Sequence, residues 1–434
     1  MLIQFSLENY GPFADRTTLN MVAMDAFSDH LDNLMESGFG DTPNLLRSTL
    51  IFGPNASGKS MLLKAMSFFK RQTLFSHRNT KGFSLSVAPF LLDAEKNGQE
   101  CRMEFVFIAD NGFRYQYGFS VCKERFPQEW LHQWNPSTGT CVTLFTRKWN
   151  EVNKDYDWSP EEGLQTSIPS FRQEWLGETL ENQLFISVAG QKKQVLPEID
   201  PVLSWFRDRL TILHLARIGY NTGDAMRLIE NPNGKQWLLN WMASADLAVS
   251  DIEVETIEEE SAQEEGGSTR RAVSYQIRFT RLRSDGKKII MSSANESRGT
   301  MTWFRMSGYW KDALENDRVV IVDELERDLH SFLVEYLIDQ YHSPNLSSKA
   351  QLISTTHALS LMDKERFRQD QIRLLEKDRK YRTTLYSLGE FTLPEGMSFY
   401  RAYQEARVGG IPIIPERSLF ESVVKTETRG GESP

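Results

Sequence analysis

The chain has 434 residues, of which 40% are hydrophobic and 25% are charged, and its formal net charge at pH 7 is −9. This composition is typical of a folded globular protein and excludes a disordered or low-complexity chain. The length exceeds what one small hydrophobic core serves. We therefore expect one large α/β domain, or a domain that carries a sizeable insertion.

The sequence carries no signal for a membrane span or for export. No run approaches the roughly 18 consecutive apolar residues that a membrane helix needs, and the N-terminus lacks a basic region followed by an apolar stretch. The three cysteines, Cys101, Cys122 and Cys141, have no metal-type spacing, and their odd number suits buried thiols in a reducing compartment. We therefore predict a soluble, cytoplasmic protein without a membrane partner.

The negative net charge argues against a broad nucleic-acid surface, because phosphate binding depends on clustered Lys and Arg side chains. A modest basic cluster flanks a Ser-Asp-Gly turn and is interpreted as a solvated hairpin; it consists of Arg281, Arg283, Lys287 and Lys288. A groove formed on dimerisation can still be basic, so nucleic-acid binding stays open.

The first elements in chain order are strands and one helix. Alternation over residues 2–7 predicts a half-buried strand, and the apolar run 48–52 predicts a buried strand that leads through a glycine-rich loop into a helix. From about residue 83 to residue 134 the pattern is β-like, with a hairpin signal at Asp110-Asn111-Gly112. These patterns predict an antiparallel sheet in the N-terminal part.

Helical periodicity takes over between about residues 181 and 247, for example at Val202, Phe206, Leu210 and Leu213. The acidic segment 255–267 is interpreted as a solvated loop or hairpin tip. Further strands are expected at 273–279, 288–291, 318–322 and 350–354, with helices at about 292–314 and after residue 324. We divide the chain into an N-terminal lobe (1–180), a helical lobe (181–250) and a C-terminal lobe (251–434).

The strongest motif fits the pattern G-x-x-x-x-G-K-[ST] and lies between the predicted buried strand and the predicted helix. Its residues are Gly53, Pro54, Asn55, Ala56, Ser57, Gly58, Lys59 and Ser60. The glycines let the backbone wrap a phosphate, whose charge meets successive amides and the helix N-terminus. Lys59 is expected to reach the β- and γ-phosphates of ATP, and Ser60 to ligate Mg²⁺.

A second acidic motif narrows the class of nucleotide-binding protein. The apolar strand from Val319 ends in Asp323-Glu324, where one acid can hold the magnesium shell and the next can orient or deprotonate an attacking water. Adjacent acids at a strand end are also common helix N-caps. Together with the phosphate loop, they predict an ATP hydrolase that uses Mg²⁺.

The order of four segments resembles ABC-type ATPases of the SMC and RecF branch. These segments are GPNASGKS, ESRGT at 296–300, VVIVDELERDLH at 319–330 and QLISTTH at 351–357. Within that branch the chain is most similar to compact bacterial AAA-type ATPases of the RloA and AbiL kind, which are associated with phage defence. The resemblance implies an ABC-type head: a mixed α/β sheet with an antiparallel β subdomain and a helical lobe.

The resemblance also implies roles for individual residues. Asp323 becomes the metal carboxylate, Glu324 the hydrolytic base, and His357 the switch histidine that senses the γ-phosphate. A histidine at the end of a buried strand can instead be a satisfied polar residue at a sheet edge. The Q-loop glutamine is assigned to Gln191, for which an ordinary helix cap is the alternative, and Asp328 falls at the D-loop position.

The signature loop of one subunit completes the nucleotide site of another in such ATPases. By resemblance, Ser297, Gly299 and Thr300 would therefore contact ATP in trans, and the active form would be a homodimer or a higher homo-oligomer. The chain has Ser-Arg-Gly-Thr in place of the transporter signature, and its small residues suit a close approach to phosphate. Arg298 is open to two interpretations, a transition-state cation or a surface charge.

The resemblance predicts an ATP-driven dimer switch that holds or frees a separate effector, such as a nuclease, in anti-phage defence. The alternative is a DNA-repair or nuclease-type ATPase that acts directly on DNA. Against intrinsic nuclease activity, the nearby acids after His357 lie in what is interpreted as two exposed strands joined by a basic turn; they are Glu376, Asp378 and Glu390. An SMC-like clamp would require long heptad arms, and the sequence has none.

Overall fold

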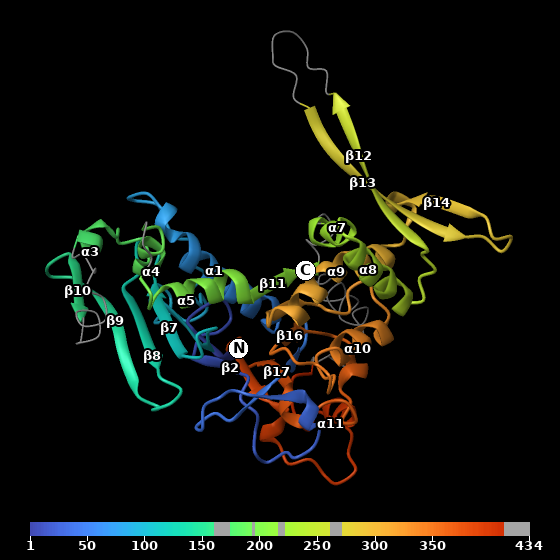
Figure 1. Cartoon of the computed structure of the whole chain (residues 1–434). Coiled ribbons are helices and arrows are strands. Elements are labelled where there is room, and N and C mark those ends of the chain that lie inside the picture. The colour runs from blue at the N-terminus through green and yellow to red at the C-terminus, as the bar shows by residue number, and fades with distance from the viewer. Residues whose placement is uncertain (160–173, 193–195, 216–221, 261–270, 412–434) are drawn as a thin grey trace, which may run out of the picture.

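The computed structural model describes residues 1–159, 174–192, 196–215, 222–260 and 271–411. Two large sheets and a helical layer make up the body, and a β-hairpin projects from it (Figure 1). Among the described residues, no helix combines the length and the apolar character needed to cross a membrane.

The central sheet has six strands in the order β11-β15-β16-β5-β17-β18. The first five run parallel and β18 pairs antiparallel with β17. Every residue of β5 and β16 is buried, which agrees with their continuous apolar or small-residue runs. The bounds are β11 Leu210–His214, β15 Val319–Asp323, β16 Gln351–Thr355, β5 Ser48–Phe52, β17 Ile372–Lys377 and β18 Thr383–Ser387.

The second sheet is fully antiparallel and has seven strands in the order β10-β9-β8-β7-β6-β1-β2. The predicted hairpin at Asp110-Asn111-Gly112 joins β6 to β7, while residues 83–100, which precede β6, contain no strand. The bounds are β1 Leu2–Glu8, β2 Thr17–Asn20, β6 Cys101–Ile108, β7 Arg114–Val121, β8 Gln128–Trp134, β9 Cys141–Asn150 and β10 Asp155–Ser159. A small sheet pairs β3 Leu34–Glu36 with β4 Asn44–Leu46.

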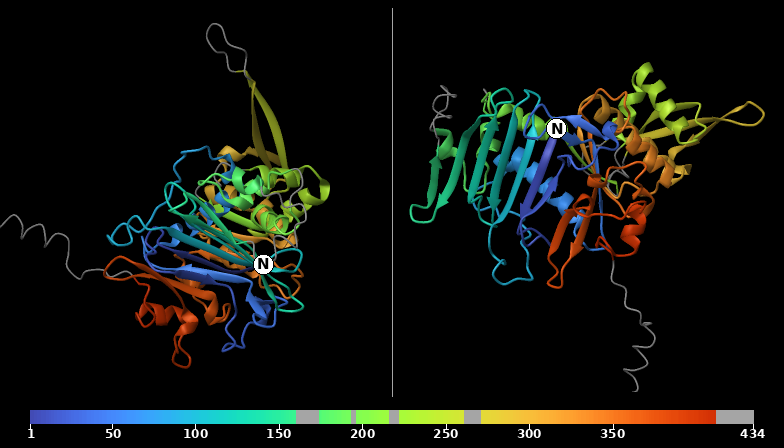
Figure 2. Two further views of the ribbon diagram at one scale, coloured as in Figure 1. Left: turned by 90° about the vertical axis from the view of Figure 1, so that its left-hand side faces the viewer. Right: turned by 90° about the horizontal axis from the view of Figure 1, so that it is seen from below.

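Helix α1 (Lys59–Phe75) lies between the two large sheets and joins them into one core. Phe69 on this helix stacks on Phe119 of β7 with ring centroids 4.4 Å apart and contacts Phe5 of β1 edge-on. Figure 2 shows α1 running beneath the antiparallel sheet toward the central sheet. Three short helices accompany this core: α3 Glu174–Glu178, α4 Phe185–Ala189 and α5 Asp200–Ser204.

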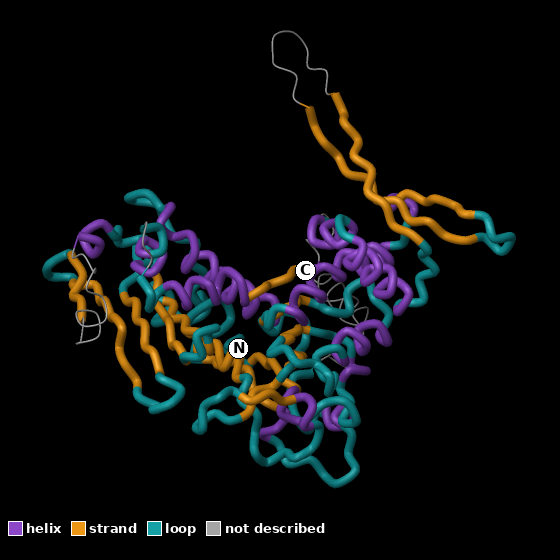
Figure 3. Tube along the Cα trace, in the orientation of Figure 1, coloured by secondary structure: helices purple, strands orange, loops and turns teal. Residues whose placement is uncertain are grey.

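Further helices cover the opposite face of the central sheet and form a second core (Figure 3). Trp303 and Trp310 are buried there together with Phe52 and Val320 of the sheet. The indole groups of Trp241 and Trp303 each donate to the other residue's carbonyl oxygen, at 2.9 and 2.8 Å. The helices are α7 Gly223–Ile229, α8 Pro232–Ser244, α9 Arg298–Glu315, α10 Ser331–Asp339 and α11 Phe399–Gln404.

The projecting sheet contains β12 (Asp251–Glu260), β13 (Arg271–Leu282) and β14 (Lys288–Ser292). The basic cluster around Gly286 lies at the β13–β14 turn, as predicted. The loop interpretation of 255–267 is corrected in part. Its first residues, through Glu260, are a strand because they pair with β13, and an ion pair joins Glu255 to Arg278; residues 261–267 lie outside the described residues.

Two other predictions about secondary structure are wrong. The helix predicted through Leu213 ends at Arg209, after which Leu210–His214 form β11, because these residues pair with β15 in the parallel sheet. The two strands predicted at 372–388 are present, with β18 at the edge of the sheet, but the first of them is not exposed. Strand β17 lies between β5 and β18, and Leu374 and Leu375 are fully buried. The predicted division into three lobes stays a prediction.

Candidate functional site

The predicted motifs meet at one edge of the central sheet. Strands β5, β15 and β16 are parallel neighbours, so their carboxyl ends lie together. The phosphate loop follows β5, Asp323-Glu324 ends β15, and His357 comes two residues after β16. Segments that are some 300 residues apart in the chain therefore form one site.

The phosphate loop wraps the N-terminus of α1. Gly58 caps this helix at a φ of 112°, and a Cβ atom there would lie 3.0 Å from Pro12 and 3.3 Å from Thr383. Ala56 also has a left-handed φ of 61°, which residues other than glycine rarely adopt. A helix N-terminus carries amides without partners within the helix, and such an end suits a phosphate group.

Lys59 lies buried inside the loop. Its Nζ donates to the carbonyl oxygen of Gly53 at 2.6 Å and of Pro54 at 3.1 Å. Burial lowers the pKa of Lys59, and the nearby carboxylates of Asp323, Glu324 and Glu326 oppose that shift. The chemistry of this donor set fits a polyphosphate, whose oxygens would satisfy the ammonium group better than two carbonyl groups do.

Ser57 provides a second test of whether the loop fits a polyphosphate. Its hydroxyl oxygen is buried and has no hydrogen-bond partner in the part of the chain that the structure describes. A buried hydroxyl without a partner is costly, and a bound phosphate oxygen next to the loop would supply that partner. The loop therefore fits the phosphate chain of a nucleotide.

Ser60, Asp323 and Thr355 form a hydrogen-bonded chain at the adjacent strand ends. Ser60 Oγ donates to Asp323 Oδ1 at 3.3 Å, and Thr355 Oγ1 donates to the same oxygen at 2.7 Å. Thr355 Oγ1 also accepts the backbone N–H of Glu324 at 2.9 Å. A hydroxyl next to a carboxylate is a donor set that suits Mg²⁺, which usually takes only one or two protein carboxylates and keeps several waters.

Glu324 stands at the mouth of the site in an unusual backbone conformation. Its φ is 55°, in the left-handed region, and its carboxylate makes an ion pair of 3.2 Å with Arg327. Residues held in this region cluster at functional sites. The strain supports a functional role for this residue more than the ordinary helix cap that the sequence also allowed.

A backbone hydrogen bond joins His357 to the loop that follows Glu324. The backbone N–H of His357 donates to Glu326 Oε1 at 2.5 Å. The other carboxylate oxygen of Glu326 is buried and has no hydrogen-bond partner among the described residues. The position of the histidine thus depends on an acid two residues beyond Glu324.

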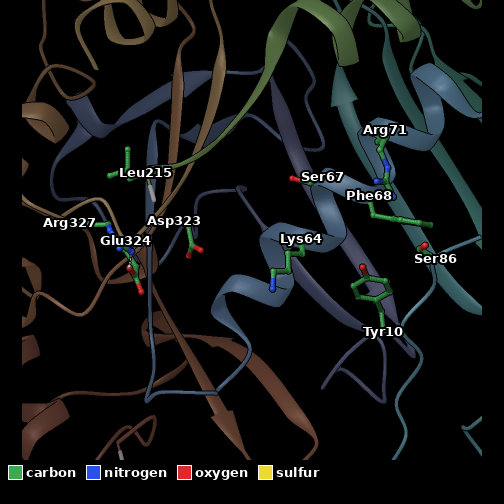
Figure 4. A pocket seen from close by; sticks show the side chains of 10 residues that line it. All are labelled: Tyr10, Lys64, Ser67, Phe68, Arg71, Ser86, Leu215, Asp323, Glu324 and Arg327. Carbon is green, nitrogen blue, oxygen red and sulfur yellow. Dashed lines mark hydrogen bonds and ion pairs between the residues drawn. The ribbon is translucent and has the colours of Figure 1, made fainter. Parts of the chain in front are cut away.

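In the described part of the chain, three cavities border the loop, the acids or His357, and two of them include Glu324. One of about 340 Å³ is lined by residues 55–61 of the loop together with Pro12, Glu324, His357 and Lys377. A neighbouring one of about 330 Å³ lies between the acids and the side of α1. Figure 4 shows Asp323 and Glu324 on one side of it, with Lys64 of α1 across from them. Glu324 lines both cavities.

A profile of the family described as "AAA domain, putative AbiEii toxin, Type IV TA system" matches residues 48–363, well over half of the chain. The chain belongs to this family. The matched segment contains the phosphate loop, both acids and His357. It confirms the predicted recognition of an AAA-type domain that carries a phosphate loop.

A comparison of this AAA domain with solved structures finds two distant matches. The SMC head domain from Thermotoga maritima is 12% identical, with a TM-score of 0.39 over 89% of this chain and 98% of that one. An SMC head crystallised with the C-winged helix domain of ScpA is 13% identical, with a TM-score of 0.34 over 91% and 98%. No curated protein sequence matches the chain.

The predicted fold class of the AAA domain is confirmed. The expected mixed α/β architecture is present in the parallel sheet that carries the phosphate loop, the antiparallel sheet and the helices over the second core. The roles of individual residues stay predictions, and the structure fixes where each of them lies.

The signature residues lie next to the D-loop of their own chain. Ser297 caps α9 by accepting the Thr300 N–H at 3.0 Å, and Arg298 makes a 3.3 Å ion pair with Asp328. A Cβ atom at Gly299 would lie 2.8 Å from the carbonyl oxygen of Asp328. Among the described residues, none of Ser297, Gly299 and Thr300 lines the cavity beside the phosphate loop.

Gln191 is not brought to this site. It follows α4 and is exposed, and α4 packs at the far end of α1, where Ser187 contacts His77 at 3.0 Å. Helix α1 separates that end from the phosphate loop by its length of about 25 Å, at about 1.5 Å per residue. The Q-loop role of Gln191 stays a prediction without support from its position.

Sequence reasoning missed three residues of the site: Thr355, Glu326 and Lys377. Thr355 had a local signal, because a hydroxyl side chain in a buried strand requires a partner. Glu326 was hidden among the charged residues of ELERD. Lys377 had no local signal at all, since it reaches the phosphate loop only through the pairing of β17 with β5.

Proposed function

We propose that the chain binds ATP in the phosphate loop and hydrolyses it with Glu324 as the base, as an ATP-driven dimer switch. The observation that carries the proposal is the hydrogen-bonded chain from Ser60 through Asp323 and Thr355 to Glu324. It places one acid beside the loop hydroxyl and the next at the mouth of the cavity. ATP hydrolysis uses one acid to hold Mg²⁺ and another group to orient or deprotonate the attacking water.

Within this proposal Lys59 and the loop amides bind the phosphates. Ser60 and Asp323 would hold Mg²⁺, which neutralises charge on the triphosphate when it is bound. Glu324 accepts a proton from the attacking water, and His357 lies across the same cavity, where it can contact the γ-phosphate end. Glu324 lines the cavity, and its carboxylate pairs with Arg327 at 3.2 Å.

The proposal of a dimer rests on which residues line the cavity beside the phosphate loop. In the described residues, the wall beside the loop and Glu324 contains no residue from the signature segment 297–300, although that segment is exposed at Ser297 and Arg298. A second copy that presents Ser297, Gly299 and Thr300 would complete the site. ATP would then favour the paired state, and hydrolysis would release it.

We infer that the paired state holds or frees a separate effector protein, such as a nuclease, in defence against phage. Membership in a family whose description names an AbiEii toxin supports this setting. The switch itself needs no chemistry beyond ATP hydrolysis, because differential affinity of ATP for two states is enough to shift their populations.

ATP binding and phosphate release by purified full-length variants test the proposal. Lys59→Ala should abolish ATP binding, because it removes the buried phosphate cation. Glu324→Gln should bind ATP like the wild type yet release phosphate at least about 100-fold more slowly, because only the base is lost.

Glu365→Gln is the matched control. The Glu365 side chain is 80% exposed. Glu365 precedes β17, at the amino end of that strand, whereas the candidate site lies at the carboxyl ends of the strands. Turnover of this variant should equal that of the wild type. Equal ATP affinity for wild type and Lys59→Ala, or normal turnover of Glu324→Gln, would show that the assignment is wrong.

A further inference from the structure

Lys377 lies beside the phosphate loop but belongs to none of the motifs described above. Strand β17 runs parallel to β5, and Leu374 pairs with Phe52, the last residue of β5. The strand continues beyond this pair, so that Leu375 lies against Gly53 and Lys377 lies beside the phosphate loop. Lys377 therefore stands at the carboxyl edge of the parallel strands, where ligands of such sheets bind.

Thr383 fixes this hairpin to the loop. It is the strand partner of Lys377, and its Oγ1 donates to the carbonyl oxygen of Ser57 at 2.8 Å. Its backbone N–H donates to the carbonyl oxygen of Pro12, also at 2.8 Å. Three segments of the chain thus meet at Thr383, and the place of Lys377 in the cavity wall is set by backbone pairing.

The Lys377 ammonium group has no partner in the described part of the protein, either by hydrogen bond or by ion pair, although the side chain is only partly exposed. Its neighbouring acids are engaged elsewhere. Glu376 accepts the Tyr386 hydroxyl at 3.0 Å, and Asp378 pairs with Arg382 at 2.8 Å. An unpaired cation in the wall of a cavity that also contains the loop amides favours an anionic ligand.

The position of β17 relative to β5 indicates which part of a bound nucleotide lies next to Lys377. The acids and His357 follow β15 and β16, on one side of β5, and they mark the γ-phosphate end under the proposed function. Strand β17 lies on the other side of β5. A nucleotide whose β-phosphate sits in the loop would therefore extend its nucleoside end toward β17.

We propose that Lys377 is a nucleotide-binding residue that contacts the α-phosphate and ribose end of ATP. This inference rests on the proposed function, since it assumes that the loop holds a nucleotide. Lys377 contributes to nucleotide affinity. It does not distinguish ATP from ADP, because both nucleotides contain the same α-phosphate and ribose.

Calorimetric titration of full-length protein with Mg-ATP and with Mg-ADP tests the inference. Lys377→Gln should weaken the binding of both nucleotides by about tenfold, the typical loss for one charge-assisted contact. Lys377→Arg should retain most of the affinity. Lys380→Gln is the matched control, because Lys380 is an exposed lysine of the same hairpin that does not line the cavity.

The outcomes separate the inference from the function on which it rests. Wild type that binds no nucleotide, or that binds it as Lys59→Ala does, would contradict the proposed function. Weakened ATP and ADP binding in Lys377→Gln, with an unchanged thermal melting midpoint, supports the inference. Unchanged binding in Lys377→Gln, or a loss confined to ATP, would overturn it while the ATPase assignment stands.

Discussion

Thr355 donates its hydroxyl hydrogen to Asp323 Oδ1 at 2.7 Å and accepts the backbone N–H of Glu324 at 2.9 Å. One side chain on the neighbouring strand thus holds both the carboxylate proposed to bind Mg²⁺ and the backbone of the proposed base. Because β16 is buried along its whole length, this hydroxyl is fixed in position by the central sheet. We therefore propose that Thr355 positions both acids.

Thr355→Val keeps the shape of the side chain and removes the hydroxyl. We expect kcat to fall by about 10- to 100-fold, the usual loss for a group that orients a metal ligand, with a smaller change in KM. Thr355→Ser should restore most of kcat, because it returns the hydroxyl. Steady-state phosphate release checks this, and equal kcat values for the Val and Ser variants would contradict the positioning role.

Glu326 links His357 to the loop after Glu324, because its Oε1 accepts the His357 backbone N–H at 2.5 Å. Glu326→Ala removes this acceptor, so we expect kcat to fall by about tenfold while the Kd for ATP changes little. Glu326→Gln keeps an acceptor oxygen and should stay within about threefold of wild type. A parallel loss of kcat in both variants would instead indicate that the charge of Glu326 matters.

The composite site can be tested by mixing two inactive variants. A bulky residue at Gly299 would first clash with Asp328 of its own chain, so Ser297, which is exposed, is the cleaner position. Ser297→Trp and Lys59→Ala should each have little turnover. A mixture should regain activity, because a mixed dimer pairs an intact phosphate loop with an intact signature loop; a mixture as inactive as its components would argue against sharing in trans.

His342 gives the fold a pH dependence that is independent of the site. Its Nε2 lies 2.8 Å from Ser48 Oγ at the start of β5. Burial lowers the pKa of His342 to about 3, with smaller contributions from Arg366, His30 and Arg47. The folded state therefore excludes a proton that the unfolded chain binds below its ordinary pKa of about 6.5.

The free energy of unfolding should consequently fall as the pH drops from about 6.5 toward 3, by at most about 1.4 kcal/mol per pH unit from this group. Urea unfolding at about pH 7, 6 and 5 measures the slope. His342→Gln lacks the titrating group and should show a shallower loss of stability than the wild type over that interval. Identical slopes would show that His342 does not carry this dependence.

The site was predictable where its chemistry is contiguous in sequence. The phosphate loop and Asp323-Glu324 each follow directly on a buried strand, so local pattern and motif agree, and the structure places them together. Thr355, Glu326 and Lys377 could not be assigned this way, because their contacts depend on which strands become neighbours. Lys377 is more than 300 residues from the loop that it approaches.

The fold shows the same division between local and tertiary determinants. The hairpin at Asp110-Asn111-Gly112 was predictable because its turn residues require that backbone. The segment at Leu210–His214 was predicted as helix because its apolar spacing fits a helical face. Pairing with β15 makes it a strand instead, which is an example of tertiary contacts overriding a local pattern.

The most direct test of the ATP-driven dimer switch is the light-scattering mass of Glu324→Gln protein with and without Mg-ATP. This variant should bind ATP and be unable to hydrolyse it, so the closed state should accumulate. We predict the mass of one chain without nucleotide and twice that mass with Mg-ATP, and no increase when Lys59→Ala is added to the same protein. A mass that ATP leaves unchanged, in protein shown to bind ATP, would contradict the dimer switch.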